Sequence, residues 1–439
     1  MQVYKFGGTS VGKPERMHAV ADLITRDETP KIVVLSALSG TTNSLVSIGE
    51  SLASDSKNEA LDKINALRAH YDNFIVGLLS TEEKRREATE IINEHFEFLK
   101  ITLKISFNEA LNRDILAQGE LMSTKLFTLA LQERNIGGQL LPALEFMRTN
   151  EDHEPDLDYI SRELTARIEA HPNQKIFVTQ GYICKNHKGE IDNLQRGGSD
   201  YTASLVGAAI RASEIQIWTD IDGMHNNDPR VVDKTYPIAE LSFDEAAELA
   251  YFGAKILHPA SIWPAQKYGI PVKLLNTMQP DAKGTVISTH TISADVKAIA
   301  AKDGITAIKV KSTRMLLAYG FLRKIFEIFE KYRTPIDMIT TSEVAVSVTI
   351  DEDENLDKIT TELRQFGQVE VDAGQTIICI VGNFVAEQKG IVNKIFEALK
   401  ETPIRMISYG GSRHNISLLT DSANKEHALK VLNEHLFDL

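Results

Sequence analysis

Two hydrophobic patterns alternate along residues 1–290 of the chain. Short apolar runs predict β-strands at Val3–Phe6, Lys31–Ser36, Lys175–Gly181, Ile215–Thr219 and Val272–Leu275. Longer stretches with apolar residues on one face predict helices at Glu15–Thr25, Glu83–Phe107, Asn112–Glu133, Tyr201–Ala212 and Phe243–Tyr251. Because the strands are nearly continuous in Val and Ile, they are expected to be buried on both faces. The pattern therefore predicts a three-layer αβα sandwich with a mostly parallel sheet.

The last part of the chain contains a repeat. Gly320-Phe-Leu-Arg-Lys-Ile-Phe-Glu aligns with Gly390-Ile-Val-Asn-Lys-Ile-Phe-Glu, and Thr334-Pro-Ile-Asp-Met-Ile aligns with Thr402-Pro-Ile-Arg-Met-Ile. Strands are expected downstream of each copy, at Val344–Ile350 and Asn415–Leu419. Two copies predict a tandem module, since a solenoid needs at least three. The repeat is interpreted either as duplicated structural padding or as a pair of ligand sites at glycine-initiated helices.

Composition and charge narrow the classes of function. The 439 residues carry a formal net charge of −13, which disfavours general binding to nucleic acids or anionic membranes. An anionic substrate must therefore be bound by a local cluster of cations and backbone N–H groups. The two cysteines, Cys184 and Cys379, have no disulfide or zinc spacing. With no evident targeting segment and no apolar run of membrane-spanning length, a cytoplasmic location is expected.

The sequence Lys5-Phe6-Gly7-Gly8-Thr9-Ser10 follows the first predicted strand and precedes a helix. Adjacent glycines allow the backbone to approach a ligand closely, and N–H groups at a helix start favour a phosphate. The lysine precedes the glycines, so this is not a Walker A loop. A plain tight turn explains the glycines equally well.

A second pair of glycines occurs in Arg196-Gly197-Gly198-Ser199-Asp200-Tyr201-Thr202-Ala203. It is expected to open a helix with Ser199 or Asp200 as the N-cap. A guanidinium beside two glycines suits a carboxylate or a phosphate. Gly119-Glu120 is expected to place an acid at a loop-to-helix junction, where Glu120 either binds a ligand or stabilises the first helical turn.

A third group of residues follows the predicted strand Ile215–Thr219. It comprises Trp218-Thr219-Asp220-Ile221-Asp222-Gly223, then Asp228-Pro229-Arg230, and then Phe252-Gly253-Ala254-Lys255-Ile256-Leu257-His258-Pro259. Polar residues at the carboxyl end of a parallel strand are well placed for a ligand. The twelve histidines show no metal-ligand spacing, and no protein metal ligand is predicted.

Together these motifs closely resemble the aspartate kinases of the amino-acid kinase family, specifically a monofunctional, lysine-sensitive-like type. The similarity runs in order through KFGGTSVG, VVLSALSGTTN, QGELMST, RTN, RGGSDYTA, WTDIDG, DPRVV, FGAKILHPA and ITTSEV. It implies an amino-acid kinase domain over residues 1–290 followed by two C-terminal α+β ACT domains of ferredoxin-like fold. The first ACT domain is expected at 303–373, and the second is expected to combine 297–302 with 374–439.

The resemblance implies that ATP phosphorylates the side-chain carboxylate of L-aspartate to give 4-phospho-L-aspartate, the entry to lysine, threonine and methionine synthesis. Lys5, Asp200 and Lys255 are the implied catalytic residues, with Asp200 holding Lys5 in place. The residues implied for aspartate binding are Thr42, Glu120, Arg196 and Ser199. Because the acceptor carboxylate is already ionised, catalysis is expected to rest on positioning and charge neutralisation.

The resemblance also implies the nucleotide and effector residues. ATP contacts are expected from Lys5, Gly7, Gly8, Ser36, Thr219, Asp220, His225, Arg230 and Lys255, with Mg²⁺ carried mainly by the phosphates. Effector contacts are expected from Met315, Ala318, Phe321, Leu322, Pro335, Ile336, Asp337, Thr341, Ser342 and Glu343. His225 replaces a tyrosine common in related enzymes, and Ala318 and Pro335 replace serines of lysine-inhibited members. Lysine is therefore the favoured effector, with threonine or weak regulation as rivals, and a homodimer through the ACT domains is expected.

Two other functions remain open at the sequence level. One is another acyl-phosphate-forming kinase of this fold, acting on glutamate, carbamate or a nucleotide monophosphate. Glu120, Arg196, Asp200 and the ACT tail argue against it. The other is a non-catalytic amino-acid sensor, against which the intact Lys5, Asp200 and Lys255 argue.

Overall fold

A computed structural model describes residues 1–194, 197–253, 257–289, 296–315 and 319–437. The chain divides into two compact units. The first unit comprises residues 1–224 and 257–289, and the second comprises residues 225–256 and 290–439. The stretch 225–256 thus groups with the tail, although it lies within the predicted kinase domain in the sequence.

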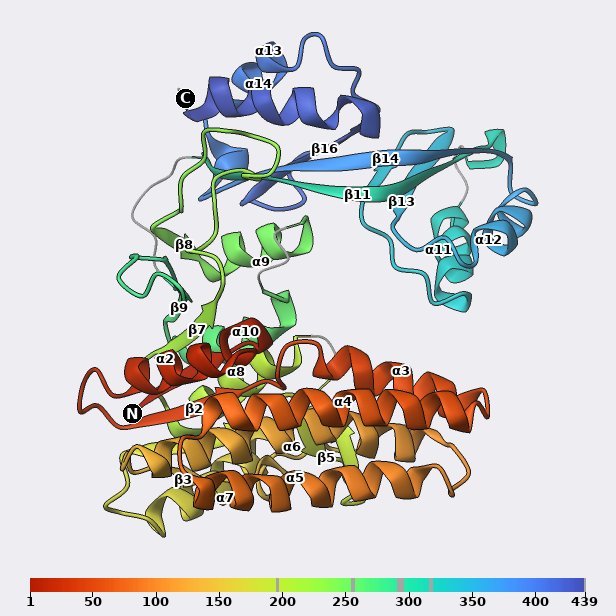
Figure 1. The fold of residues 1–439 in the computed structure, drawn as a ribbon. Helices are drawn as coiled ribbons and strands as arrows, with labels where there is room; N and C mark the ends of the chain where they lie inside the picture. The colour runs from red at the N-terminus through yellow and green to blue at the C-terminus, as the bar shows by residue number, and fades with distance from the viewer. Residues whose placement is uncertain (195–196, 254–256, 290–295, 316–318, 438–439) are drawn as a thin grey trace. The chain divides into compact units, whose positions relative to one another are not determined.

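The first unit alternates strands and helices as the hydrophobic pattern predicts (Figure 1). Its strands are β1 (Gln2–Phe6), β2 (Lys31–Leu35), β3 (Gln139–Leu140), β4 (Ile176–Gln180), β5 (Ile183–Lys185), β6 (Ile191–Asn193), β7 (Ile215–Thr219), β9 (Val272–Asn276) and β10 (Thr285–Ser288). Its helices are α1 (Gly8–Val11), α2 (Pro14–Ile24), α3 (Thr41–Ala53), α4 (Lys57–Leu78), α5 (Glu82–Thr102), α6 (Glu109–Glu133), α7 (Leu157–Glu169), α8 (Gly198–Ile210) and α10 (Pro259–Tyr268).

The main sheet of this unit has the strand order β3-β4-β2-β1-β7-β9-β10. All neighbours pair in parallel except β10, which runs antiparallel to β9. The chain moves from β1 to β2 on one side and later adds β7 on the other side. The strand order therefore reverses between β1 and β7, and in open sheets of this kind ligands bind beyond the carboxyl ends of the strands at such a point.

Helices cover both faces of this sheet. Tyr4 and Phe6 of β1 belong to a buried core that also includes side chains of α2 through α6. α8 packs against β1, β2 and β7, and α7 and α10 pack against α8. Since side chains alternate along a strand, Lys5 points to the face that α8 covers. Figure 1 shows the long helices α4, α5 and α6 side by side. They pack against one another beside the sheet.

The second unit is built on a six-stranded antiparallel sheet of order β12-β13-β11-β14-β16-β15. The strands of this sheet are β11 (Val296–Lys311), β12 (Ile339–Thr341), β13 (Ala345–Ile350), β14 (Gln368–Gly382), β15 (Met406–Ser408) and β16 (Asn415–Asp421). The unit also contains the short strand β8 (Glu240–Ser242). Its helices are α9 (Phe243–Tyr251), α11 (Phe321–Lys331), α12 (Leu356–Leu363), α13 (Ile391–Ala398) and α14 (Lys425–Phe437). The long strands β11 and β14 run through the whole sheet (Figure 1), with breaks in register near residues 302–307.

The sequence repeat corresponds to a structural repeat. Gly320 and Gly390 precede α11 and α13 in the left-handed region, with φ of +77° and +82°. A residue with a Cβ adopts this conformation only with strain, so glycine is favoured at both positions. Each helix is followed by a pair of antiparallel strands, β12 with β13 and β15 with β16.

The predicted fold class is confirmed: the chain contains a mostly parallel sheet covered by helices and an antiparallel α+β tail. Predicted strands and helices differ from the observed ones mainly at their ends. The short strands β3, β5, β6 and β10 were not predicted, because two to four residues carry too little periodicity. The ranges of the long strands β11 and β14 and of the helices α7 and α10 were also not predicted. Within the described residues, no helix is long and apolar enough to cross a membrane.

Candidate active site

Lys5 and Asp200 form an ion pair at the carboxyl edge of the first unit's sheet. Lys5 lies near the end of β1 and Asp200 in the first turn of α8, with 2.7 Å between Nζ and Oδ1. Their side chains are 12% and 14% exposed, so the pair is largely shielded while remaining accessible from the edge. Screening by water is therefore weak at this site, and the position of the ammonium group is well defined.

The two glycine pairs provide room around this ion pair. A Cβ on Gly7 would lie 3.3 Å from Lys5 Nζ, and a Cβ on Gly8 would lie 3.0 Å from the carbonyl oxygen of Ala37. A Cβ on Gly198 would lie only 2.4 Å from the Tyr182 ring. The glycines therefore serve close approach of chain segments as well as turn formation.

A chain of hydroxyl contacts joins the loop after β2 to the start of α8. Ser36 Oγ donates to Ser199 Oγ at 2.9 Å, and Ser123 of α6 donates to the Ser36 carbonyl at 2.8 Å. These bonds fix the loop after β2 against two helices. Thr42 is exposed in the first turn of α3, beside this loop, whereas its neighbour Thr41 is buried.

Glu120 is buried beneath the same loop. The prediction that it lies at a loop-to-helix junction is wrong: it occupies the middle of α6, because the helical pattern continues through Gly119. One carboxylate oxygen accepts from the Ala37 N–H at 3.2 Å, and the other has no partner among the described residues. Burial raises the pKa of Glu120 to about 8, although the Ala37 N–H opposes the shift. A buried carboxyl with a free oxygen is suited to receive a cationic ligand group.

The start of α8 differs from the prediction in one respect. Neither Ser199 nor Asp200 is the N-cap: Gly197 occupies that position with φ of +72° and makes no side-chain cap. Ser199 and Asp200 are consequently in the first helical turn, with their side chains directed to Ser36 and Lys5. Their free helix N–H groups and the helix dipole favour an anion nearby.

The carboxyl end of β7 adjoins β1, since Trp218 pairs with Phe6. Thr219 Oγ1 donates to Asp220 Oδ1 at 3.1 Å, and Asp220 is exposed. In the same unit, Ser10 Oγ lies 2.7 Å from Thr277 Oγ1. Ser10 and Thr277 were not predicted as site residues. Ser10 stands in the first glycine motif, but nothing in the sequence links it to residue 277.

Tyr182 is a further residue that the sequence did not single out. It adopts φ of +66°, an uncommon conformation for a residue with a Cβ, and its N–H donates to Thr202 Oγ1 at 3.0 Å. This strained position packs the ring against Gly198 at the start of α8. The only sequence signal was its place directly after Gly181 at the end of a strand.

The remaining predicted residues either are not described by the structure or belong to the second unit. Arg196, Lys255 and Ala318 lie outside the described residues. His225 and Arg230 belong to the second unit, where Arg230 is exposed and forms a bidentate pair with Asp228 at 2.8 and 2.9 Å.

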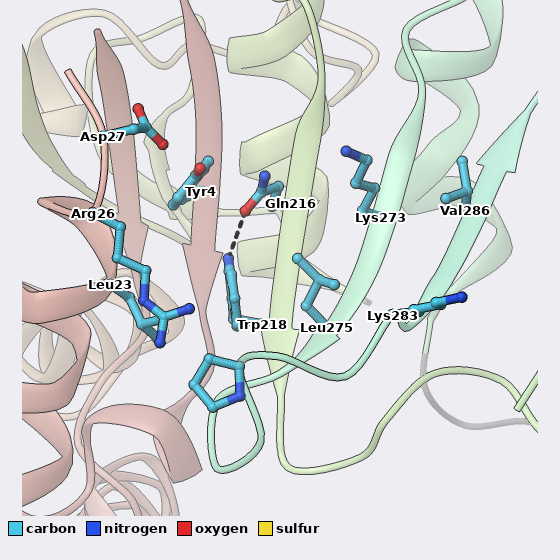
Figure 2. Close-up of a pocket in the computed structure, with 11 residues that line it drawn as sticks. Tyr4, Leu23, Arg26, Asp27, Gln216, Trp218, Lys273, Leu275, Lys283 and Val286 are labelled. Atoms are coloured by element: carbon cyan, nitrogen blue, oxygen red, sulfur yellow. Dashed lines mark hydrogen bonds between the residues drawn. The ribbon is translucent and has the colours of Figure 1, made fainter. Parts of the chain in front are cut away.

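A separate hollow of about 410 Å³ opens on the face of the sheet, away from the carboxyl edge (Figure 2). Trp218 Nε1 donates to Gln216 Oε1 within it at 3.1 Å. Its lining residues are Tyr4, Leu23, Arg26, Asp27, Gln216, Trp218, Lys273, Leu275, Pro280, Lys283 and Val286. None of the predicted site residues that the structure describes lines this hollow. Lys5 points to the opposite face of the sheet.

The predicted effector residues that the structure describes surround α11 and β12 in the second unit. Met315, Leu322 and Ile336 pack against the core formed by α11, α12 and β13, to which the buried Phe321 belongs. Pro335, Thr341, Ser342 and Glu343 are exposed. Asp337 has a side chain only 1% exposed and pairs with Lys302 at 2.7 Å.

No group of three or more His, Cys, Asp or Glu side chains in the described part of the chain is arranged to hold a metal ion. The site instead offers one ammonium group, glycine-rich backbone and a helix start for anions, and one buried carboxyl group for a cation. This combination suits a phosphoryl transfer in which positioning and charge neutralisation lower the barrier.

Comparison with known proteins identifies relatives over the whole chain. Residues 1–276 match the model of the amino acid kinase family, and residues 378–436 match an ACT domain. Lysine-sensitive aspartokinase 3 of Escherichia coli is 36% identical, with 99% of both chains covered. The chloroplastic aspartokinase 3 of Arabidopsis thaliana is also 36% identical, covering 99% of this chain and 81% of that protein.

Solved structures agree with this result. E. coli aspartokinase III in complex with aspartate and ADP superposes with a TM-score of 0.85 at 34% identity over 100% of both chains. The same enzyme with lysine and aspartate gives a TM-score of 0.83 at 35% identity, covering 100% of this chain and 99% of that one.

Proposed function

The chain belongs to the aspartokinases of the amino acid kinase family, and from this premise we propose how its residues carry out the reaction. The enzyme transfers the γ-phosphoryl group of ATP to the side-chain carboxylate of L-aspartate. A P–O bond forms to the carboxylate oxygen as the bond to ADP breaks, which gives ADP and 4-phospho-L-aspartate. The observation that carries this proposal is the shielded Lys5–Asp200 pair between two glycine turns at the carboxyl edge.

Charge neutralisation is the main task, because a carboxylate must approach a polyanion. The acceptor is ionised at neutral pH, so no general base is required. Lys5 brings its ammonium group to the transferring phosphoryl group, and Gly7 and Gly8 offer their N–H groups to phosphate oxygens. The close approach of neighbouring atoms to both glycines supports this role. Asp200 positions Lys5 through the 2.7 Å ion pair.

Aspartate is held by groups of opposite sign. Glu120 receives the substrate ammonium group, and its unpartnered buried oxygen supports this role. Arg196 binds a substrate carboxylate, while Thr42 and Ser199 add hydrogen bonds. The aspartate in the structure of the E. coli relative supports this substrate.

The nucleotide is bound by the carboxyl end of β7 and by further side chains. Ser36, Thr219 and Asp220 contribute from the first unit, and His225, Arg230 and Lys255 contribute from elsewhere in the chain. The ADP bound to the E. coli relative supports nucleotide use. When bound with the nucleotide, Mg²⁺ would neutralise phosphate charge, and its ligands would be mainly phosphate oxygens.

A hydroxamate assay tests the reaction. Purified protein with Mg·ATP and L-aspartate is expected to yield an acyl phosphate that hydroxylamine traps as a hydroxamate. L-Glutamate, carbamate and nucleotide monophosphates serve as competing acceptors in parallel reactions. Turnover of glutamate equal to that of aspartate would overturn the substrate assignment, and no product from any acceptor would favour the non-catalytic sensor.

The second unit is proposed to bind an amino-acid effector. We assign a first ACT domain to 303–373 and a second to 297–302 with 374–439, a division supported by the way β11 and β14 each contribute to both halves of the sheet. L-Lysine is the proposed inhibitor, with Asp337 as the carboxylate that receives its amine. The lysine in the structure of the E. coli relative supports this choice.

Assembly and effector choice are open to direct measurement. We propose a homodimer formed through the ACT domains, which light scattering would detect as twice the 48.8 kDa chain mass. A titration of lysine and threonine into the kinase assay identifies the effector. Inhibition by threonine but not by lysine would reverse the assignment.

A further inference from the structure

Three side chains surround the ammonium group of Lys302 in the second unit. Its Nζ lies 2.7 Å from Asp337 Oδ1, 2.8 Å from Asp351 Oδ2 and 4.5 Å from the centre of the Tyr251 ring. The Tyr251 hydroxyl donates to the same Asp337 oxygen at 2.8 Å. Carboxylates and an aromatic face around one ammonium group are how proteins bind amine ligands. The ammonium group of Lys302 thus occupies a site of the kind that binds amine ligands.

The charges in this cluster are not balanced. One lysine faces two carboxylates, and Asp337 is almost fully buried. Asp337 Oδ2 is buried and has no hydrogen-bond partner among the described residues. A buried, unpaired carboxylate oxygen is unfavourable. The cluster therefore retains negative charge and an open acceptor that favour a second donor group.

We propose that Lys302 is a resident cation that competes with the amine of a free effector for Asp337. This inference rests on the proposed effector function of the second unit. A tethered amine has a high effective concentration at its site. A free amino acid must displace it or share the carboxylate with it, so Lys302 lowers effector affinity.

Tyr251 connects the same carboxylate to α9. It is the last residue of α9, and in the sequence Lys255 follows four residues later. An effector amine that binds Asp337 Oδ1 leaves the Tyr251 hydroxyl without its hydrogen-bond acceptor. Tyr251 is therefore a positioning residue: when an effector binds Asp337, the hydrogen bond of Tyr251 changes, and with it the contact that holds the end of α9.

Calorimetric titration of L-lysine into full-length protein tests the competition. Lys302→Met is expected to bind lysine at least about tenfold more tightly than the wild type, because the tethered competitor is gone. The matched control is Lys309→Met on the same strand, where Lys309 pairs with Glu370 at 3.5 Å, and its affinity should equal that of the wild type. If Lys302→Met does not fold, Lys302→Gln keeps a donor at Asp337 without the charge.

Unchanged or weaker lysine binding in the Lys302 variant would overturn the proposal, since Lys302 would then be a structural counterion or a contact for the effector's carboxylate. Tyr251→Phe gives an independent measurement. It should bind lysine at least as tightly as the wild type, yet lysine should inhibit its kinase activity less. Wild-type binding together with wild-type inhibition would exclude Tyr251 from the coupling.

Asp337→Asn separates the competition from the effector function. Loss of lysine binding in this variant, with no effect of Lys302→Met, overturns the competition and leaves the effector site in place. Absence of lysine and threonine binding in the wild type and in every variant overturns both.

Discussion

Two lysine–aspartate pairs with the same 2.7 Å separation occur in different surroundings. Lys5 and Asp200 balance each other's charge amid glycine turns and a helix start, so the remaining groups there favour an anion. Lys302 and Asp337 share their site with a second carboxylate and an aromatic ring, so the remaining charge favours a cation. The same contact thus belongs to a phosphate site in one unit and to an amine site in the other. The groups around a buried pair, more than the pair itself, determine its ligand.

The largest effect is expected when the cation of the first pair is removed. Lys5→Met should fold, because only one partly shielded contact is lost, yet its kcat should fall at least about a hundredfold. Circular dichroism checks the fold and the hydroxamate assay measures the rate. Activity within a few-fold of the wild type would remove Lys5 from the mechanism.

Removing the anion of the same pair should have a smaller effect. Asp200→Asn keeps the shape of the side chain but loses the charge that holds Lys5, so kcat should fall by roughly tenfold to a hundredfold. The lysine remains present, which is why the loss should be less than that of Lys5→Met. Steady-state kinetics with ATP as the varied substrate checks this order, and an Asp200→Asn defect exceeding that of Lys5→Met would contradict a positioning role.

Glu120 extends the comparison to a carboxyl group with no cation in the described structure. With its pKa near 8, it is mostly protonated at pH 6 and becomes a carboxylate as the pH rises. A carboxylate holds the substrate ammonium group better, so KM for aspartate should fall by up to about tenfold per pH unit below 8. Glu120→Gln should have a high KM that does not vary in this way.

The same carboxyl group predicts a change in stability with pH. Its folded pKa lies above the ordinary value of 4.5, so the folded state binds the proton more tightly than the unfolded chain. The free energy of unfolding should therefore decrease as the pH rises from about 4.5 to 8. Denaturant titrations of wild type and Glu120→Gln across this range check the sign, since the variant lacks this contribution.

The smallest effect is expected at a third lysine–aspartate pair. Lys425 and Asp303 lie 2.5 Å apart, and their side chains are 22% and 54% exposed, so this pair is more accessible to solvent than the other two. Lys425→Met should lower the free energy of unfolding by less than about 1 kcal/mol and leave kcat and lysine affinity unchanged. A large loss of activity in Lys425→Met would contradict the comparison, because an ion pair would then affect activity regardless of the groups around it.

Much of the site followed from local sequence. Lys5, the Gly7-Gly8 pair and Thr219 each stand at the end of a predicted strand, so their place at the carboxyl edge was predictable. The predicted helix Asn112–Glu133 already ran through Gly119, yet Glu120 was placed at a loop-to-helix junction on the strength of that glycine. The helix continues through Gly119 and brings Glu120 under the Ala37 N–H. Thr277 lacked a local signal that would place it near the site, and Tyr182 had only its position directly after Gly181.

The sequence by itself determined the alternation of strands and helices, the repeat and the motifs of the family, because each depends on residues close together in the chain. Tertiary structure alone decided which distant groups meet. Ser36 reaches Ser199, and Lys302 reaches Asp337 and Tyr251, only after the fold brings their elements together. The Lys5–Asp200 pair was implied by the family resemblance, but its distance and burial came from the structure. Burial and the sign of the local charge depend on those long-range contacts, and periodicity along a single element does not encode them.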